Sequence, residues 1–352
     1  MNDNDDYLWN RSGAVDPQIA ELERLLAGHA LGPASRRALV RTAARRPRRR
    51  WRVAIAAAAV LALCAIGMQH WYQQRLQWDA GEPWQVIARQ GDVRTDGSHA
   101  RALAVDGLIE TGAGGAARLR AAGIGEVAIG PGSRLRLVET RTGRHRVQLQ
   151  QGRMWARVWA PPGQFGVSLP GSDVFDLGCE FELAIDAAGN GSLRVRSGWV
   201  QIDNTHREVL APQGTRVRLH GSGAAGTPYA EDAAAAFIAA LDAVDARAGA
   251  VDPQGVEVRA LIATSRAQDA ITLLSLLQAY PQLGDGPLLE RMAQLLPAVP
   301  ASRAGWQRDR TAQLGAWWNG LPYPRMKRWW MQWPDALPMR DAGVEAWLRE
   351  GG

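Results

Sequence analysis

Apolar and polar residues alternate along the middle of the chain, from Trp84 to about Leu219. Successive side chains of a β-strand point to opposite faces, so this period of two predicts strands with one buried face. The clearest run is CEFELAI at residues 179–185, whose odd-numbered positions are apolar while Glu180 and Glu182 face the other way. Turns rich in glycine and proline separate the runs. The pattern predicts a β domain over residues 84–220, built as a sandwich, a jelly roll or a short solenoid.

A period near 3.6 replaces the alternation after about Glu231. Apolar residues at this spacing predict amphipathic helices, and they are Phe237, Leu241, Val244, Ile271, Leu274, Leu277, Leu288, Met292 and Leu295. We therefore expect a helical C-terminal module over 231–352. The stretch 221–230 begins with GSGAAGTP, a composition typical of a linker between modules.

An uncharged stretch of 22 residues runs from Val53 to Gln74. As a helix it would cover roughly 33 Å, which matches a hydrocarbon core of about 30 Å. Aromatic residues flank it on both sides, as at membrane interfaces. The pattern predicts a transmembrane helix at 51–74; the alternatives are a buried alanine-rich core helix and a cleaved signal peptide preceded by an unusually long tail.

Positive charge is concentrated before that stretch. The chain has a net charge of +6, and nine arginines lie between Arg36 and Arg52 with no acidic residue among them. The basicity is therefore local and predicts no nucleic-acid partner. By the positive-inside rule it places the N-terminus in the cytoplasm, so we expect a single-pass protein of the bacterial inner membrane with most of its chain in the periplasm.

The predicted cytoplasmic tail, residues 1–50, contains one candidate helix. Asp16-Pro17 offers an N-cap and a proline suited to a first turn. The apolar stripe that follows on one helical face is formed by Ile19, Leu22, Leu25 and Leu26. A helix this short cannot bury its own stripe, so the pattern predicts a partner-binding surface, unless the tail is unstructured and these residues are incidental.

Several segments of the middle region resemble the FecR domain. They are GDVRTDG (91–97), LQQGRMWARVWAPPGQFGVSLPGSDVFDLGCEFEL (149–183) and VRSGWVQI (195–202). Gly178 suits a turn or bulge before the next strand, and Asp176 can accept hydrogen bonds from nearby backbone. Cys179 stands where the family often has threonine, and we expect it to be a small core residue.

The resemblance implies a signalling role, since the best-known FecR proteins are membrane-anchored regulators that pair a cytoplasmic σ factor with an outer-membrane receptor. We expect a sensor that relays an envelope signal to a cytoplasmic partner such as a σ factor. The larger helical N-terminal module of those regulators is absent from this sequence. The alternative is a membrane-anchored periplasmic scaffold, or a protein- or glycan-binding protein, without a transcriptional role. The sequence leaves the oligomeric state open.

Motifs for chemistry are missing from the sequence. The six histidines show no metal-ligand spacing, and no Gly-x-Ser-x-Gly motif occurs. Glu180 and Glu182 share a strand face, but paired strand acids more often serve solubility and pairing than hydrolysis. We predict no enzyme, no metal and no cofactor, and the two cysteines predict no disulfide framework.

Seven of the 15 tryptophans lie between Trp306 and Trp347. Trp329, Trp330 and Trp333 stand beside basic residues and are candidates for contact with a protein partner or a membrane interface. Burial between helices is the alternative. Adjacent tryptophans such as Trp317-Trp318 point about 100° apart on a helix, so both cannot be fully buried.

Overall fold

The structure is a computed structural model that describes residues 17–27, 48–96, 101–204, 207–247, 249–323 and 342–349. Contacts between residues divide the chain into two units, Met1–Trp71 and Tyr72–Gly352.

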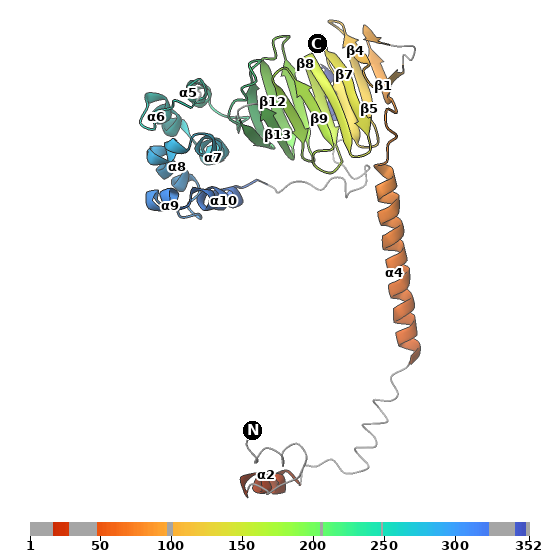
Figure 1. The fold of residues 1–352 in the computed structure, drawn as a ribbon, viewed down its shortest axis with the longest axis vertical. Helices are drawn as coiled ribbons and strands as arrows, with labels where there is room; N and C mark the ends of the chain where they lie inside the picture. The colour runs from red at the N-terminus through yellow and green to blue at the C-terminus, as the bar shows by residue number, and fades with distance from the viewer. Residues whose placement is uncertain are drawn as a thin grey trace. The chain divides into compact units, whose positions relative to one another are not determined.

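Two helices account for the described part of the first unit, and Figure 1 labels both. Helix α2 (Pro17–Ala27) begins at the proline that the sequence marks as its first residue. Helix α4 (Arg48–Arg75) continues a few residues past the unit's end. Its described side chains from Ile55 to Trp71 are all exposed.

The transmembrane helix predicted at 51–74 is confirmed as a helix but not as a span. Within the described residues, no helix combines the length and the apolar character needed to cross a membrane. The uncharged stretch contains Gln69, His70, Gln73 and Gln74, so its continuously apolar part, residues 53–68, falls short of the roughly 20 residues that a span usually needs.

Sixteen strands form the β domain of the second unit (Figure 1). In chain order the strands are β1 (Trp84–Gln90), β2 (Val93–Thr95), β3 (Ala102–Leu103), β4 (Leu108–Thr111), β5 (Ala116–Ala121), β6 (Gly125–Ile129), β7 (Arg134–Arg141), β8 (Arg144–Val158), β9 (Phe165–Leu169), β10 (Ser172–Asp176), β11 (Glu180–Ile185), β12 (Gly191–Ser197), β13 (Trp199–Asn204), β14 (Glu208–Pro212), β15 (Thr215–Leu219) and β16 (Tyr229–Ala230).

The strands pair into two sheets that share β8. Sheet A has the order β3-β1-β5-β6-β8-β11-β12-β15-β16, and sheet B has the order β2-β4-β7-β8-β9-β10-β13-β14. Every pair is antiparallel except β8 with β9. The first half of β8 pairs in sheet B and its second half in sheet A. One 15-residue strand therefore ties the two layers together.

The change of sheet in β8 falls at Gly152, where φ is 98°. A side chain there would be strained at this φ, and its Cβ would lie 2.3 Å from the Cα of Ser133. Glycine is thus required both by the backbone conformation and by the close approach of the neighbouring turn.

The core lies between the two sheets. The odd-numbered side chains of CEFELAI, from Cys179 to Ile185, are all buried in it, as the alternation predicts. Trp84 and Phe165 are fully buried, with ring centroids 6.3 Å apart. Of the three architectures that the sequence left open, the two-sheet sandwich is the one observed.

A turn before β11 takes the form that its sequence predicts. Gly178 has φ of 87°, and its N–H donates to the carboxylate of Asp176 at 3.0 Å. The N–H of Cys179 donates to the other oxygen of that carboxylate at 2.8 Å. Asp176 is fully buried. Burial raises its pKa to about 7, although the hydrogen bonds from Cys179 and Gly178 oppose that shift.

Helices follow the sandwich, as the change of period predicts. They are α5 (Ala235–Asp245), α6 (Val256–Thr264), α7 (Ala270–Ala279), α8 (Pro287–Leu295), α9 (Arg303–Arg308), α10 (Arg310–Gly320) and α11 (Ala342–Arg349), with 3₁₀ turns at Ala267–Asp269 and Pro281–Asp285. The predicted apolar residues lie in one core, although Leu295 is only partly buried.

The segment predicted to be a linker, 221–230, is largely buried in the described structure. Ala225 bridges to Leu219, and Tyr229 and Ala230 form β16 beside β15. Thr227 is 1% exposed. Its small residues suit close packing against the neighbouring strand rather than free movement between modules.

We expect Asp176 to give the sandwich a measurable pH dependence. An acid whose pKa is raised by folding stabilises the folded state below its unfolded pKa, near 4, and loses that contribution as pH rises to the folded value. The stability of the wild type relative to Asp176→Asn should therefore fall between pH 4 and 7, by up to about 1.4 kcal/mol per pH unit, and level off above pH 7. Urea unfolding at a series of pH values measures this difference.

Asp186→Asn is the matched control, because the carboxylate of Asp186 is exposed and hydrogen bonds lower its pKa. Its difference from the wild type should stay level from pH 5 to 8. A level difference for Asp176→Asn as well would contradict the assignment of a raised pKa to Asp176.

Candidate functional site

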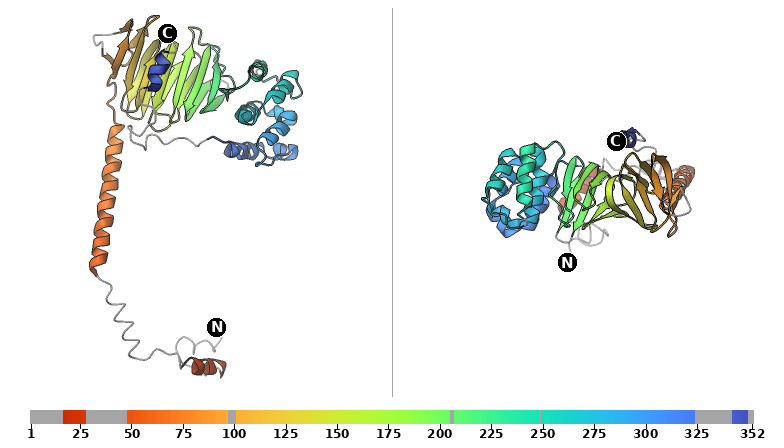
Figure 2. Two further views of the ribbon diagram at one scale, coloured as in Figure 1. Left: turned by 180° about the vertical axis from the view of Figure 1, so that it is seen from behind. Right: turned by 90° about the horizontal axis from the view of Figure 1, so that it is seen from above.

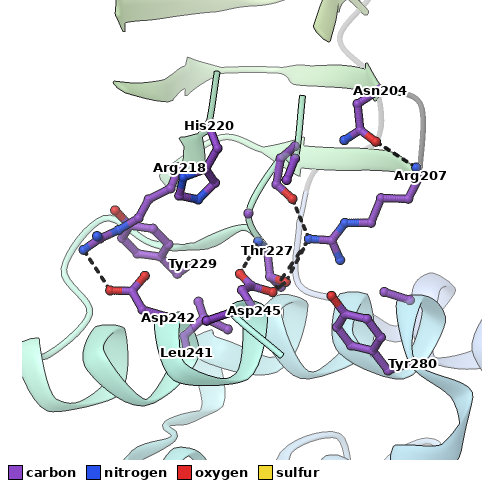
Figure 3. Close-up of a pocket in the computed structure, with 15 residues that line it drawn as sticks. Asn204, Arg207, Arg218, His220, Thr227, Tyr229, Leu241, Asp242, Asp245 and Tyr280 are labelled. Atoms are coloured by element: carbon purple, nitrogen blue, oxygen red, sulfur yellow. Dashed lines mark hydrogen bonds and ion pairs between the residues drawn. The ribbon is translucent and has the colours of Figure 1, made fainter. Parts of the chain in front are cut away.

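A pocket of about 650 Å³ lies where the sandwich meets the helices, and Figure 3 shows its lining. Strands β13 and β15 and the segment 224–229 form one side. Helix α5 and the C-terminal end of α7 form the other. The pocket is therefore built from both modules of the second unit.

Asp245 of α5 is the centre of the polar contacts in this pocket (Figure 3). Its two carboxylate oxygens accept from the N–H of Thr227 at 2.8 Å and from the hydroxyl of Thr227 at 2.7 Å. Arg207 lies 3.7 Å from the same carboxylate and also donates to the carbonyl of Ala225 at 2.7 Å. The side chains of Asp245 and Arg207 are 17% and 19% exposed, so this pair is largely shielded from water.

A second ion pair joins Arg218 of β15 to Asp242, one turn earlier on α5, at 3.1 Å. These two side chains are more open to solvent, at 45% and 38% exposure. Partial burial raises the pKa of Asp242, and the Arg218 guanidinium acts against this shift.

The pocket's charges are paired across its two sides. Two arginines face two aspartates, and the guanidinium of Arg207 also lies 5.8 Å from the ring centroid of Tyr280. Since both carboxylates already accept from or face an arginine, neither is placed as a free general base. The arrangement is suited to holding the helices against the sandwich.

An aromatic group makes a second junction between the modules. Trp199 of β13 packs against Trp318 of α10, with ring centroids 5.3 Å apart, and against Tyr323 at 5.9 Å. Burial raises the pKa of Tyr323 to about 12. Sequence analysis did not single out Trp199, because its partners lie more than a hundred residues away along the chain.

The structure describes the predicted stripe in the N-terminal tail. On α2, Leu22, Leu25 and Leu26 are 57%, 68% and 57% exposed, and Ile19 is partly buried. The stripe is therefore a continuous apolar surface of the helix as described.

The predicted tryptophan group, Trp329, Trp330 and Trp333, lies outside the described residues. The other tryptophans of this region behave as helix geometry requires. Trp317 is fully buried, while its neighbour Trp318 is only partly buried.

The strand acids Glu180 and Glu182 point away from the core, as predicted, but Glu180 is not solvated. It is 3% exposed and accepts a hydrogen bond from Nε1 of Trp155 at 3.1 Å. Glu182 pairs with Arg196 and lies 3.7 Å from Arg194. Both acids are engaged in contacts along the outer face of sheet A.

Helix α11 packs on that outer face, a contact that sequence analysis did not anticipate (Figure 2). Val344 and Trp347, each 2% exposed, pack against Ala128 of β6 and Trp155 of β8. The spacing of Val344, Trp347 and Leu348 is a helical apolar stripe, and this signal could have identified α11. Its docking place could not be read from the sequence.

Among the described residues, no group of three or more histidine, cysteine or acidic side chains is arranged to hold a metal ion. Both cysteines are free thiols, with Cys64 exposed and Cys179 buried as predicted.

Residues 107–201, from just before β4 into β13, match the family model described as FecR protein. The sandwich therefore contains a FecR domain, as the sequence motifs predicted. No curated protein matches the chain.

Two solved structures of a candidate anti-sigma factor from Parabacteroides distasonis ATCC 8503 are similar to part of the chain. They are 19% and 18% identical, with TM-scores of 0.31 and 0.30. Each match covers 38% of this chain and 63% or 62% of the solved protein, so this chain spans less than two thirds of their length.

We expect Asp245→Ala to loosen the helices from the sandwich. The substitution removes the acceptor of both Thr227 hydrogen bonds and leaves Arg207 without its carboxylate, at a cost of about 2 to 4 kcal/mol in the free energy of unfolding. Asp242→Ala, one turn away and more exposed, should cost less than about 1 kcal/mol. Urea unfolding of the full chain measures both, and equal losses would contradict the role given to Asp245.

Proposed function

We propose that this chain is a FecR-type regulator held at the bacterial inner membrane. In this proposal its tail binds a cytoplasmic partner, a σ factor or another regulator, and its FecR domain responds in the periplasm to an envelope protein or receptor. The observation that carries the regulatory role is the FecR match over residues 107–201. The cytoplasmic partner and the membrane attachment rest on the residues considered next.

The tail supports a protein-binding role through α2. Three leucines on one face of an 11-residue helix are more than half exposed. A helix of this length is marginal in water by itself, and an apolar stripe on it is stabilised when it lies in a partner's groove. The stripe Ile19, Leu22, Leu25 and Leu26 is therefore the proposed partner-binding surface of the tail.

The apolar part of α4 supports membrane attachment. Large side chains are exposed on several faces of the helix, and these include Ile55 at 53%, Leu61 at 70% and Leu63 at 68%. A helix that is apolar all round is normally buried in a protein core or in lipid. The nine arginines that precede it favour the cytoplasmic side of the membrane, which is the basis of the proposed orientation.

We expect charge on the α2 stripe to abolish partner binding. The full chain carrying Leu22→Glu and Leu25→Glu should recover at least tenfold less σ factor, or other identified cytoplasmic regulator, than the wild type, because a buried unpaired carboxylate is strongly unfavourable. Affinity capture from detergent-solubilised cells, followed by mass spectrometry, measures the recovery.

Ala20→Glu is the matched control for that experiment. It places the same charge on the opposite face of α2, since residue 20 lies about 160° around the helix from Leu22 in the middle of the stripe, and recovery should stay at the wild-type level. Two results would contradict the proposed relay of a signal to a cytoplasmic partner: the wild type captures no cytoplasmic regulator, or an unrelated tail in place of residues 1–35 leaves function intact. Either result would favour the alternative of a membrane-anchored scaffold.

We expect α4 to retain the chain in the membrane fraction. The wild type should resist extraction by alkaline carbonate, whereas Val60→Lys with Leu63→Lys should move most of the protein to the supernatant, because charges near the bilayer centre are costly. A periplasmic reporter fused after residue 80 should be active. A wild-type chain extracted without detergent would contradict membrane attachment.

A further inference from the structure

The outer face of sheet A carries charged residues in cross-strand ladders. One ladder runs from Arg120 through Glu126 and Arg157 to Glu180, each residue directly opposite the next on the adjacent strand. Opposite charges across strands are favourable pairs, and two members of this ladder are shielded from water, since Arg157 is 7% and Glu180 3% exposed.

One area of this outer face is apolar rather than charged. Ala128 and Trp155 are direct cross-strand neighbours and point outward among the charged residues. The hydrogen bond from Nε1 of Trp155 to Glu180 holds the indole in a fixed orientation. We call Ala128, Gly130, Arg153 and Trp155 the Trp155 face, and a rigid indole beside small residues is typical of an anchor point in a protein interface.

Helix α11 shows which chemistry this face accepts. Val344 and Trp347 are both 2% exposed where they pack on it, and Leu348 is partly buried beside them. The Arg153 guanidinium lies 4.9 Å from the ring centroid of Trp347, in cation–π geometry. Gly130 lies beside the same indole: a Cβ added there would be 3.6 Å from the Trp347 ring, at ordinary contact distance. The face therefore fits an aliphatic residue followed three positions later by tryptophan.

The attachment of α11 is local. Its buried side chains form a cluster of their own, separate from the cores of the sandwich and of the helical module. With eight residues, α11 is shorter than the roughly 12 to 15 residues at which an isolated helix becomes marginally stable. Its helical structure thus depends on docking, and such elements open at lower cost than a core element does.

We propose that the Trp155 face is a docking site for an amphipathic helix of a protein partner, and that α11 occupies this site as an internal competitor. The partner helix carries an aliphatic residue and, three positions later, a tryptophan, as α11 does. Because α11 is tethered to its own site, the partner binds only to the fraction of chains in which α11 has left, so its apparent affinity is reduced by that fraction. This surface is distinct from the α2 stripe, and the inference holds whether or not the tail binds a σ factor.

A labelled peptide with the sequence of residues 340–351 serves as the probe of this site. Its binding to the full-length detergent-solubilised chain is measured by fluorescence anisotropy. Trp347→Ala should weaken the internal competitor, so the peptide should bind this variant at least tenfold more tightly than the wild type. Val344→Asp, a second way to release α11, should have the same effect.

Two controls test whether the peptide binds at the Trp155 face. Adding Trp155→Ala to Trp347→Ala should abolish peptide binding, and a peptide in which tryptophan is replaced by alanine should not bind either variant. Thermal unfolding of Trp347→Ala should remain close to that of the wild type, because α11 belongs to neither main core.

Three results would overturn the proposal. They are equal peptide affinity for the wild type and Trp347→Ala, no binding to either release variant, and binding that survives Trp155→Ala. A concentration-dependent dimer of the wild type that Trp347→Ala abolishes would also overturn it, because α11 of a second copy would then be the occupant of the face.

Discussion

The passage of β8 through both sheets is the constraint on which the rest of the second unit depends. Its first half pairs with β7 and β9, its second half with β6 and β11, and Gly152 allows the change of sheet between them. Since one continuous strand belongs to both layers, the two sheets cannot slide apart independently. Their inner faces enclose a single core that extends from Trp84 to Ala225 in sequence.

The pairing of β8 also determines which of its side chains lie on the outer face of sheet A, where a charged area and an apolar area lie side by side. Residues of β8 alternate, so Met154 and Ala156 enter the core while Trp155 and Arg157 point outward. On the outer face of sheet A, charges pair across strands, and the Trp155 face interrupts them with an apolar place that α11 covers. The strand that joins the two sheets, β8, therefore also carries Trp155, against which α11 packs.

The helical module is held to the sandwich by two kinds of contact. Asp245 gathers hydrogen bonds from Thr227 and an ion pair from Arg207, and Trp199 packs against Trp318 and Tyr323. Trp199 lies at the C-terminal end of the FecR match, whereas Arg207, Thr227 and Asp245 follow it in the chain.

Local sequence pattern determined much of this protein. Alternation placed Phe181 and Leu183 in the core, helical spacing placed Leu274 and Leu288 in the helices, and Pro17 marked the start of α2, because each of these signals acts between residues close in the chain. The sequence also indicated the FecR resemblance and the turn at Gly178, because both signals lie in short local segments. Only the tertiary structure decided that β8 belongs to two sheets, that segment 221–230 is largely buried, that Asp245 meets Arg207, and that Arg153 lies over Trp347. Those contacts join residues far apart in sequence, where strand register and packing rather than local periodicity determine which side chains meet.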